Sequence, residues 1–306
     1  MAEILLSLTI IGVVAAITLP SLTGNINERT WNTQRKALYA RFSQAISLMP
    51  ALNGYGTLDD TTDTAAETFV TAGLSKVLKI NNICDNEHLQ DCGITSKITI
   101  LEGTGTILLQ DIKTLRSLNS LYTSTYSYKT PDTKAAAFET ASGESILVYY
   151  NPQCSGNIQE TGHHYTQSKM CANFVYDLNG TKGPNTVGKD IGFITALYST
   201  DSVVVAPMPL SKNAGSAGHS GGRPGELCRK QDPENRAPNS EELMSIFCNK
   251  QLAGMSLQGM VGSGFFWSIS PAPSTDPRST WLHNFNTGAR QPSTSGAREP
   301  VRCVRR

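Results

Sequence analysis

The sequence predicts an α+β fold, with a long N-terminal helix packed on a small antiparallel sheet and a second α+β domain after it. Three features predict this: a charge-free apolar start that continues at helical spacing, β-branched and aromatic runs in the middle, and a Gly/Ser-rich break before a last region with its own cysteines and tryptophans. Of the 306 residues, 39% are hydrophobic and 17% charged, which suits folded β-rich domains rather than disorder. The net charge of +1 argues against nucleic acid as a partner.

The first element is an unbroken apolar run from Ile4 to Leu19 that follows a single acid, Glu3, and ends at Pro20. No further charge occurs before Glu28. This length is at the lower edge of a membrane span, which needs about 20 apolar residues. A carboxylate at its start is costly in lipid and should have a partner. The run also lacks the basic start and the small-residue cleavage site of a secretory signal peptide.

Residues 3–20 resemble the N-terminal helix of type IV pilins and pseudopilins. The resemblance implies that Glu3 pairs with the free N-terminal amine of a neighbouring subunit in a dry filament core. It implies that Gly12 lets packed helices approach closely and that Pro20 kinks the helix. By this pattern we expect the chain to begin about two residues inside the mature, methylated protein. An ordinary membrane anchor is the alternative, although an anchor does not require Glu3.

After Pro20 we expect the helix to resume and to end at Pro50 and the Asn53–Gly56 cluster. Its apolar positions recur at helical spacing and are predicted to be core: Trp31, Leu38, Phe42, Ala45, Ile46 and Met49. Residues 36–45 also resemble the amphipathic half of a pilin helix, whose apolar stripe packs on a small sheet.

Seven cysteines stand at 84, 92, 154, 171, 228, 248 and 303. Cysteines of exported chains normally oxidise, so Cys84 with Cys92 and Cys154 with Cys171 are predicted to close local loops. The spacing of Cys154, His163, His164 and Cys171 also allows a zinc site. We favour the disulfide, because adjacent histidines point apart in extended chain. Because the number of cysteines is odd, at least one thiol has no disulfide partner within the chain.

The middle of the chain predicts strands at 95–109, 145–150, 174–178 and 202–206. The segment 176–190 resembles one that is common in the globular domains of pilins and pseudopilins. Asn179-Gly180 suits a turn that needs positive φ. Asp177, Asn179 and Asp190 also present oxygen atoms at a spacing that calcium accepts, although the distal Glu of a calcium loop is missing. We favour a structural turn and leave a bound calcium as the alternative; no other cofactor is expected.

Residues 211–222 have linker composition, and the region after them carries an ordered series of motifs. The series is Cys228, Arg236–Leu243, Phe266-Trp267-Ser268, the aromatic run 281–285, and Val301–Arg305. Together they resemble bacterial lectin-like modules of the C-type lectin fold. Ala237 and Asn239 stand where that pattern usually has Leu and Thr.

The residues of this region also support a small folded domain. Asn239 or Ser240 before two acids is an N-cap, and Leu243, Ile246 and Phe247 form the buried face of a helix. Trp267 and Trp281 are predicted to be core. Within the lectin-like pattern, Cys228 would pair with Cys303 and leave Cys248 as the odd thiol; a pairing of Cys248 with Cys303 is the alternative.

Between these motifs, residues 268–300 are polar and poor in apolar side chains, as binding loops on a rigid scaffold often are. We expect six of them to contact a partner: Arg278, Trp281, His283, Asn284, Asn286 and Arg290. The region is also similar to the variable proteins of diversity-generating retroelements, which are C-type lectin-like and diversified near the C-terminus.

We therefore expect four regions: a pilin helix (1–56, with 1–25 in a membrane or filament core), a β-rich pilin domain (57–210), a linker (211–222) and a lectin-like ligand-binding domain (223–306). The expected function is that of a minor, tip-type type IV pilin that carries an adhesive module; the alternative is a pseudopilin of a type II secretion system. Its partners would be other pilin subunits and a cell-surface protein or glycan. It would lie in the inner membrane before assembly and in a surface pilus afterwards.

An enzyme is the rival class. Formylglycine-generating enzymes share the lectin-like fold and use cysteines, and Cys248 is the thiol left over. A reactive cysteine needs an electropositive setting with a base nearby. No Cys/His or Ser/His/Asp arrangement is readable around Cys248, so we expect no enzymatic activity.

Overall fold

The computed structural model describes residues 29–49, 64–100, 105–118, 133–152, 169–199, 202–207, 210–218, 224–249, 252–253, 264–272, 274–275, 277–285, 290–293 and 298–305. It confirms the α+β class: a helix over 29–48 is followed by antiparallel sheets. Glu3, Gly12 and Pro20 lie outside the described residues. Within the described ranges, no helix combines the length and the apolar character of a membrane span.

The N-terminal helix contains the boundary between two compact units, Met1–Ala40 and Arg41–Arg306. It ends just before Pro50, as expected from the steric clash of a proline ring with a preceding helical residue. In the second unit the apolar stripe is buried as predicted, and the Phe42 ring lies 4.9 Å from Phe174 and 6.3 Å from Phe138 between centroids. This part of the helix therefore packs on strands through aromatic side chains.

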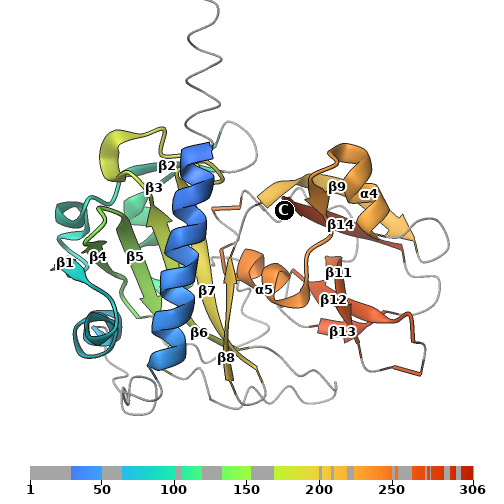
Figure 1. Cartoon of the computed structure of the whole chain (residues 1–306), viewed down its shortest axis with the longest axis horizontal. Coiled ribbons are helices and arrows are strands. Elements are labelled where there is room, and N and C mark those ends of the chain that lie inside the picture. The colour runs from blue at the N-terminus through green and yellow to red at the C-terminus, as the bar shows by residue number, and fades with distance from the viewer. Residues whose placement is uncertain are drawn as a thin grey trace, which may run out of the picture. The chain divides into compact units, whose positions relative to one another are not determined.

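The largest sheet has six strands in the order β1-β4-β5-β6-β7-β8, and every neighbouring pair is antiparallel (Figure 1). Its strands are β1 (Ile80–Cys84), β4 (Ala136–Thr140), β5 (Ser145–Tyr150), β6 (Lys169–Asp177), β7 (Ile191–Ser199) and β8 (Ser202–Pro207). Short helical segments precede β1: α2 (Ala65–Thr68), η2 (Phe69–Gly73) and η3 (Leu74–Lys76).

Three of the four predicted strands are confirmed as β5, β6 and β8. The fourth, predicted as one strand over 95–109, is instead a hairpin of β2 (Lys97–Thr99) and β3 (Thr106–Leu108). The sequence Glu102-Gly-Thr-Gly105 separates the two strands, and its glycines favour a turn over a continuous strand. Three further segments complete this part: η4 (Leu89–Cys92), η5 (Leu109–Ile112) and α3 (Leu115–Leu118).

The central strands are buried on both faces. One face of the sheet carries aromatic rings. The Phe69 ring stacks on Tyr150 with the centroids 4.3 Å apart, and its centroid lies 6.3 Å from that of Phe174. The opposite face carries Leu147, Val175 and other members of a second apolar cluster. Side chains alternate between the faces of a strand, so the near-continuous apolar run of β5 serves both faces.

Two smaller sheets form the C-terminal region, in the orders β10-β14-β9 and β11-β12-β13 (Figure 1). Their strands are β9 (Leu210–Gly218), β10 (Asn235–Arg236), β11 (Phe265–Pro271), β12 (Thr280–Asn284), β13 (Arg290–Pro292) and β14 (Arg298–Arg305). Strand β9 occupies most of the segment expected to be a linker, 211–222, and this is a correction. It pairs with β14 antiparallel, and such backbone pairing does not require β-branched side chains.

Two helices complete the region, α4 (Pro224–Gln231) and α5 (Ser240–Cys248). The Cys228–Cys303 disulfide joins α4 to β14 across 75 residues of sequence, and Cys248 is a buried thiol outside the disulfides. This favours the first of the two predicted pairings. The Cys84–Cys92 disulfide is confirmed, and Cys171 is disulfide-bonded, whereas Cys154 and the two histidines of the zinc alternative lie outside the described residues.

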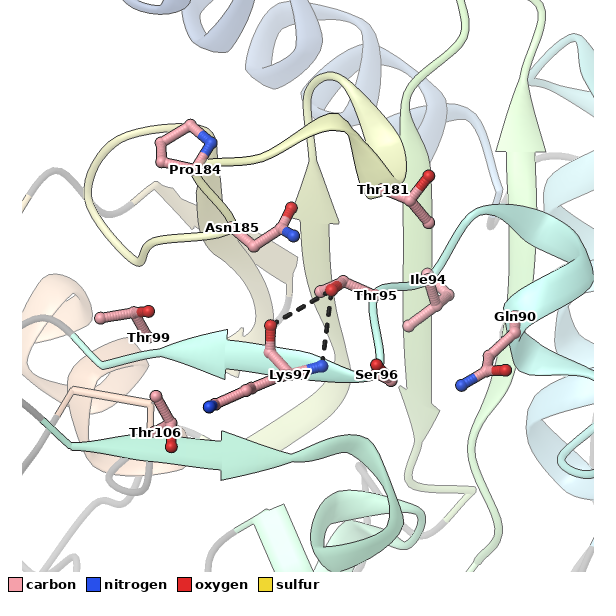
Figure 2. A pocket seen from close by; sticks show the side chains of 10 residues that line it. All are labelled: Gln90, Ile94, Thr95, Ser96, Lys97, Thr99, Thr106, Thr181, Pro184 and Asn185. Carbon is pink, nitrogen blue, oxygen red and sulfur yellow. Dashed lines mark hydrogen bonds between the residues drawn. The ribbon is translucent and has the colours of Figure 1, made fainter.

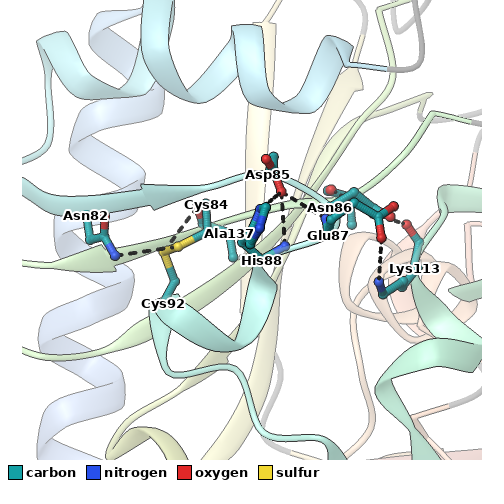
Figure 3. A network of polar contacts seen from close by, with 10 residues as sticks. Asn82, Cys84, Asp85, Asn86, Glu87, His88, Cys92, Lys113 and Ala137 are labelled. Carbon is teal, nitrogen blue, oxygen red and sulfur yellow. Dashed lines mark hydrogen bonds and ion pairs between the residues drawn. A yellow bond between two sulfur atoms is a disulfide. The ribbon is translucent and has the colours of Figure 1, made fainter.

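Polar contacts surround the Cys84–Cys92 loop at the end of β1 (Figure 3). The Asp85 carboxylate accepts the backbone N–H groups of Glu87 (2.9 Å) and His88 (3.0 Å) and contacts His88 Nδ1 at 2.8 Å. The Asn86 amide donates to the carbonyl oxygens of Lys113 and Ala135. These bonds tie the disulfide loop to the segments before β4.

The C-terminal region shares its core with the large sheet, because α5 lies against β7 and β8. A fully buried polar cluster lies at this junction. The amide of Asn173 donates to Asn249 Oδ1 (2.7 Å), and the amide of Asn249 donates back to Asn173 Oδ1 (3.0 Å). Thr195 Oγ1 donates to Asn173 Oδ1 (2.6 Å) and contacts Ser245 Oγ at 2.8 Å.

We predict that Asn249→Ala lowers the free energy of unfolding by about 2 to 3 kcal/mol, because it leaves Asn173 buried with unsatisfied groups. The double variant Asn173→Leu/Asn249→Leu should recover much of this loss, since it removes both partners together. Urea unfolding of the two variants beside the wild type measures the effect. A loss below about 0.5 kcal/mol for Asn249→Ala would contradict the role given to the pair.

Candidate functional site

The candidate site lies in the C-terminal region and starts from the N-terminus of α5. Asn239 is the N-cap, as one of the two predicted alternatives: its Oδ1 accepts the N–H of Glu242 at 2.7 Å, and Glu242 Oε2 accepts the N–H of Asn239 at 2.8 Å. Arg236 makes a bidentate contact with the same Glu242 carboxylate. This capping box fixes where Ser240, the first helical residue, points.

Ser240 connects two of the predicted contact residues. Its Oγ lies 2.8 Å from His283 Nε2 on β12 and accepts a hydrogen bond from Arg290 on β13 at 3.1 Å. His283 is 3% exposed. Burial, with a smaller contribution from the Arg290 charge, lowers the pKa of His283 to about 3. The imidazole is therefore neutral at physiological pH, and its Nε2 shares a hydrogen bond with the Ser240 hydroxyl.

Arg290 also covers a ring. Its guanidinium carbon lies 4.4 Å from the centroid of the Trp281 ring, within the range of a cation–π contact. Trp281 is 8% exposed and belongs to the core, as the sequence predicted for its ring. Strand register brings the two together, because His283 pairs with Arg290 and Trp281 with Pro292.

The six predicted contact residues differ in their exposure to solvent. Arg278 is exposed, and Asn284 and Arg290 are half-buried. His283 and Trp281 are buried, and this is a correction: they support the surface from below rather than contact a partner directly. Asn286 lies outside the described residues. We use the name C-terminal face for the three accessible residues Arg278, Asn284 and Arg290 taken together; Asn284 follows His283, the strand partner of Arg290, so its side chain points to the other side of the sheet from Arg290.

Sequence reasoning missed two features of this region. Ile269 on β11 is 48% exposed, an apolar side chain in the same sheet as the C-terminal face. The polar cluster that holds α5 on the large sheet was also missed. Its sequence signal is Asn173, a polar residue inside the apolar strand run 171–176, which indicates a buried hydrogen-bond partner.

The turn between β6 and β7, which holds the three residues of the calcium alternative, is closed by its own polar groups. Asp190, fully buried, accepts the N–H groups of Asn185 (2.8 Å) and Thr186 (2.9 Å). Asp177 Oδ1 accepts the N–H of Asn179 (3.1 Å). Burial, reinforced by the nearby Asp190 charge, raises the pKa of Asp177 to about 7. These bonds agree with the structural turn that the sequence favoured.

In the part of the chain that the structure describes, no group of three or more His, Cys, Asp or Glu side chains could hold an ion. The 177–190 turn contributes two carboxylates, and its other side-chain oxygens belong to amides.

A polar hollow of about 620 Å³ lies between this turn and the β2–β3 hairpin (Figure 2). Its walls are mostly hydroxyl and amide side chains with one lysine: Gln90, Ile94, Thr95, Ser96, Lys97, Thr99, Thr106, Thr181, Pro184 and Asn185. Thr95 Oγ1 is engaged with the backbone of Lys97. Such a lining suits a polar ligand rather than an apolar one.

Comparison with known proteins gives no relative: no protein family, no curated protein and no solved structure matches this chain.

We predict that buried neutral His283 makes stability pH-dependent. Its pKa is lowered from 6.5 to about 3, so its contribution is complete above pH 6.5. As pH falls from 6.5 towards 3, only the unfolded chain binds the proton. The free energy of unfolding therefore falls by up to about 1.4 kcal/mol per pH unit. Urea unfolding between pH 7 and 4 should show a steeper loss for the wild type than for His283→Gln. Equal slopes would mean that His283 is not held neutral.

Proposed function

We propose that this chain is a subunit of a type IV pilin-like filament and that its C-terminal region is an adhesive module of the C-type lectin kind. The observation that carries the proposal is the continuity of the N-terminal sequence. A lone acid, Glu3, is followed by a segment without charge that leads to the amphipathic helix 29–48, whose Phe42 packs on an antiparallel sheet. A helix with one apolar half and one amphipathic half suits a subunit that packs on its neighbours and carries a folded domain.

The disulfides support an extracytoplasmic location, because structural disulfides persist in oxidising compartments. A filament subunit passes through such a compartment on its way to the surface. We propose that the chain is held in the inner membrane before assembly and lies in a surface pilus afterwards.

The adhesive role is supported by the C-terminal region. Its framework is rigid: a capping box starts α5, a disulfide joins α4 to β14, and three strands carry the loops between 268 and 300. The C-terminal face adds two guanidinium groups and an amide, and Arg is common among residues that dominate interfaces. The ligand class we propose is a cell-surface glycan or protein.

Assembly through Glu3 is tested with a processed N-terminus in place. Glu3→Ala should reduce incorporation into sheared filaments more than about tenfold, because it leaves an uncompensated amine charge in an apolar core. The matched control is Glu28→Ala, which removes the next acid of the chain and should assemble normally. Normal assembly of Glu3→Ala would overturn the filament proposal.

Adhesion is tested on the C-terminal face with Arg278→Ala/Asn284→Ala. This variant spares the buried support residues, so its melting temperature should stay within about 2 °C of the wild type. Binding of the full chain to a glycan array and to protein-coated surfaces should fall at least about tenfold, since both polar contacts are lost. The control is Arg229→Ala on α4, an exposed arginine outside the face.

Unchanged binding by Arg278→Ala/Asn284→Ala would remove the C-terminal face from the proposal. A strain that lacks the chain separates the two filament classes. If its loss stops the secretion of other proteins and leaves adhesion intact, the chain is a pseudopilin of a type II secretion system.

A further inference from the structure

The polar hollow beside the β2–β3 hairpin has no part in the proposed function. Its volume of about 620 Å³ falls within the range of roughly 300 to 1,000 Å³ that is usual for small-molecule sites. Figure 2 shows Thr181 and Asn185 on the turn between β6 and β7, and Lys97 and Thr106 on the hairpin. Segments far apart in the sequence thus contribute side chains to one hollow.

Backbone hydrogen bonds hold the walls of the hollow together. The N–H of Thr99 donates to the carbonyl oxygen of Asn185 at 2.9 Å, and the N–H of Val187 donates to that of Thr99 at 3.0 Å. Within the hairpin, β2 and β3 pair antiparallel, and the N–H of Leu109 donates to the carbonyl oxygen of Ser96 at 2.9 Å. The walls are therefore largely preformed, and a ligand has little backbone to order when it binds.

The polar groups of the lining are available to a ligand. The hydroxyls of Ser96, Thr106 and Thr181 are on exposed residues and form no hydrogen bond with any described residue. Each hydroxyl can donate one hydrogen bond and accept two. Asn185 Oδ1 is buried and accepts no hydrogen bond. Because buried acceptors almost always have a partner, this oxygen needs a donor that no described residue provides. A ligand that carries several hydroxyl groups offers both donors and acceptors.

The charge of the lining is positive. Lys97 is the one charged side chain among the described residues that line the hollow, and its exposed ammonium group forms no ion pair with any of the described residues. The carboxylates of Asp177 and Asp190 are buried and accept N–H groups of the turn rather than line the hollow. The lining therefore favours a ligand with a negative charge.

The apolar part of the lining is small. It consists of Ile94 and Pro184, and no aromatic ring belongs to the described lining. A nucleobase would have no ring to stack on, and a lipid chain would have too little apolar surface. These two side chains suffice to cover one face of a small saturated ring.

We propose that this hollow binds a sugar acid, a saturated ring with several hydroxyl groups and one carboxylate, either free or as one unit of an acidic polysaccharide. Lys97 pairs with the carboxylate. Ser96, Thr106 and Thr181 exchange hydrogen bonds with the ring hydroxyls, and one of these hydroxyls donates to Asn185 Oδ1. A neutral sugar would leave the Lys97 charge without a partner. An inorganic anion, which only accepts hydrogen bonds, would leave Asn185 Oδ1 without a donor.

This proposal goes beyond the filament and adhesive functions and is tested on the full chain, in a detergent without a sugar headgroup. Ligand-observed NMR titrations compare three probes: glucuronate, glucose, which lacks the carboxylate, and acetate, which lacks the hydroxyls. Glucuronate should bind with a Kd on the order of 1 mM, as its size allows. Glucose should bind about fivefold more weakly, since an exposed ion pair contributes modestly. Acetate should neither bind measurably nor displace glucuronate.

Two variants locate the sugar acid. Lys97→Gln removes the charge, so glucuronate should bind about fivefold more weakly, as glucose does, while glucose binding stays unchanged. Ser96→Ala/Thr181→Val removes two hydroxyls and should weaken both sugars by about fivefold or more. All three residues are exposed, so the melting temperatures should stay within about 2 °C of the wild type. The control is Lys182→Gln, an exposed lysine beside Thr181 that does not line the hollow and should bind glucuronate normally.

The source of the ligand is read from chain length. Tighter binding of a galacturonate trimer than of galacturonate itself would identify a unit of an acidic polysaccharide, and equal binding would identify a free sugar acid. Both results support the hollow as the site, provided that Lys97→Gln weakens them.

Four outcomes would overturn the proposal. The first is a wild-type chain that binds no glucuronate. The second is an equal loss in Lys97→Gln and Lys182→Gln, which would indicate attraction by surface charge alone. The third is displacement of glucuronate by acetate, which would indicate a plain anion site. The fourth is normal binding by Lys97→Gln with loss in Arg278→Ala/Asn284→Ala, which would assign the sugar to the C-terminal face and leave the adhesive proposal standing.

Discussion

The reciprocal amide pair of Asn173 and Asn249 fixes how the last third of the chain lies on the large sheet. Apolar packing between α5 and β7 is not directional, so it allows the helix several positions. The two amides exchange hydrogen bonds with each other, and Thr195 and Ser245 extend the network. All of these bonds form together in one position of the helix alone. A buried polar cluster with every member bonded strengthens one arrangement and penalises the others.

The C-terminal face depends on the same junction. Helix α5 is held by the sheet at its C-terminal end, where Asn249 lies, and presents Ser240 at its N-terminal end. Ser240 holds His283 and Arg290, and Arg290 lies over Trp281. A series of short contacts thus leads from the middle of the large sheet to the surface proposed to bind a ligand. The support of that surface is fixed before any ligand arrives, which lowers the entropy lost on binding.

The sequence predicted features set by local patterns. Strand β5 was found to the residue, since an apolar run bounded by Gly143 and a turn has few alternatives. The acids that follow Asn239 and Ser240 narrowed the N-cap to these two residues, of which Asn239 is the one observed. Features set by distant partners were not found. Strand β9 has the composition of a linker and is a strand because β14 pairs with it. His283 was placed on the surface, and only the partner Ser240, 43 residues away in sequence, shows why it is buried.

The disulfide between Cys228 and Cys303 also bears on mechanics. The residues proposed to bind a ligand lie inside the loop that this bond closes, so a pull on a bound ligand is shared between the chain from Cys228 and the chain from Cys303. Arg290 is 62 residues from Cys228 (290 − 228) and 13 residues from Cys303 (303 − 290) along the chain. With the bond intact, the shorter path limits the stretch to on the order of 45 Å, whereas the longer path alone could extend to on the order of 200 Å. Reduction of this one bond would turn a short, stiff attachment into a long, compliant one.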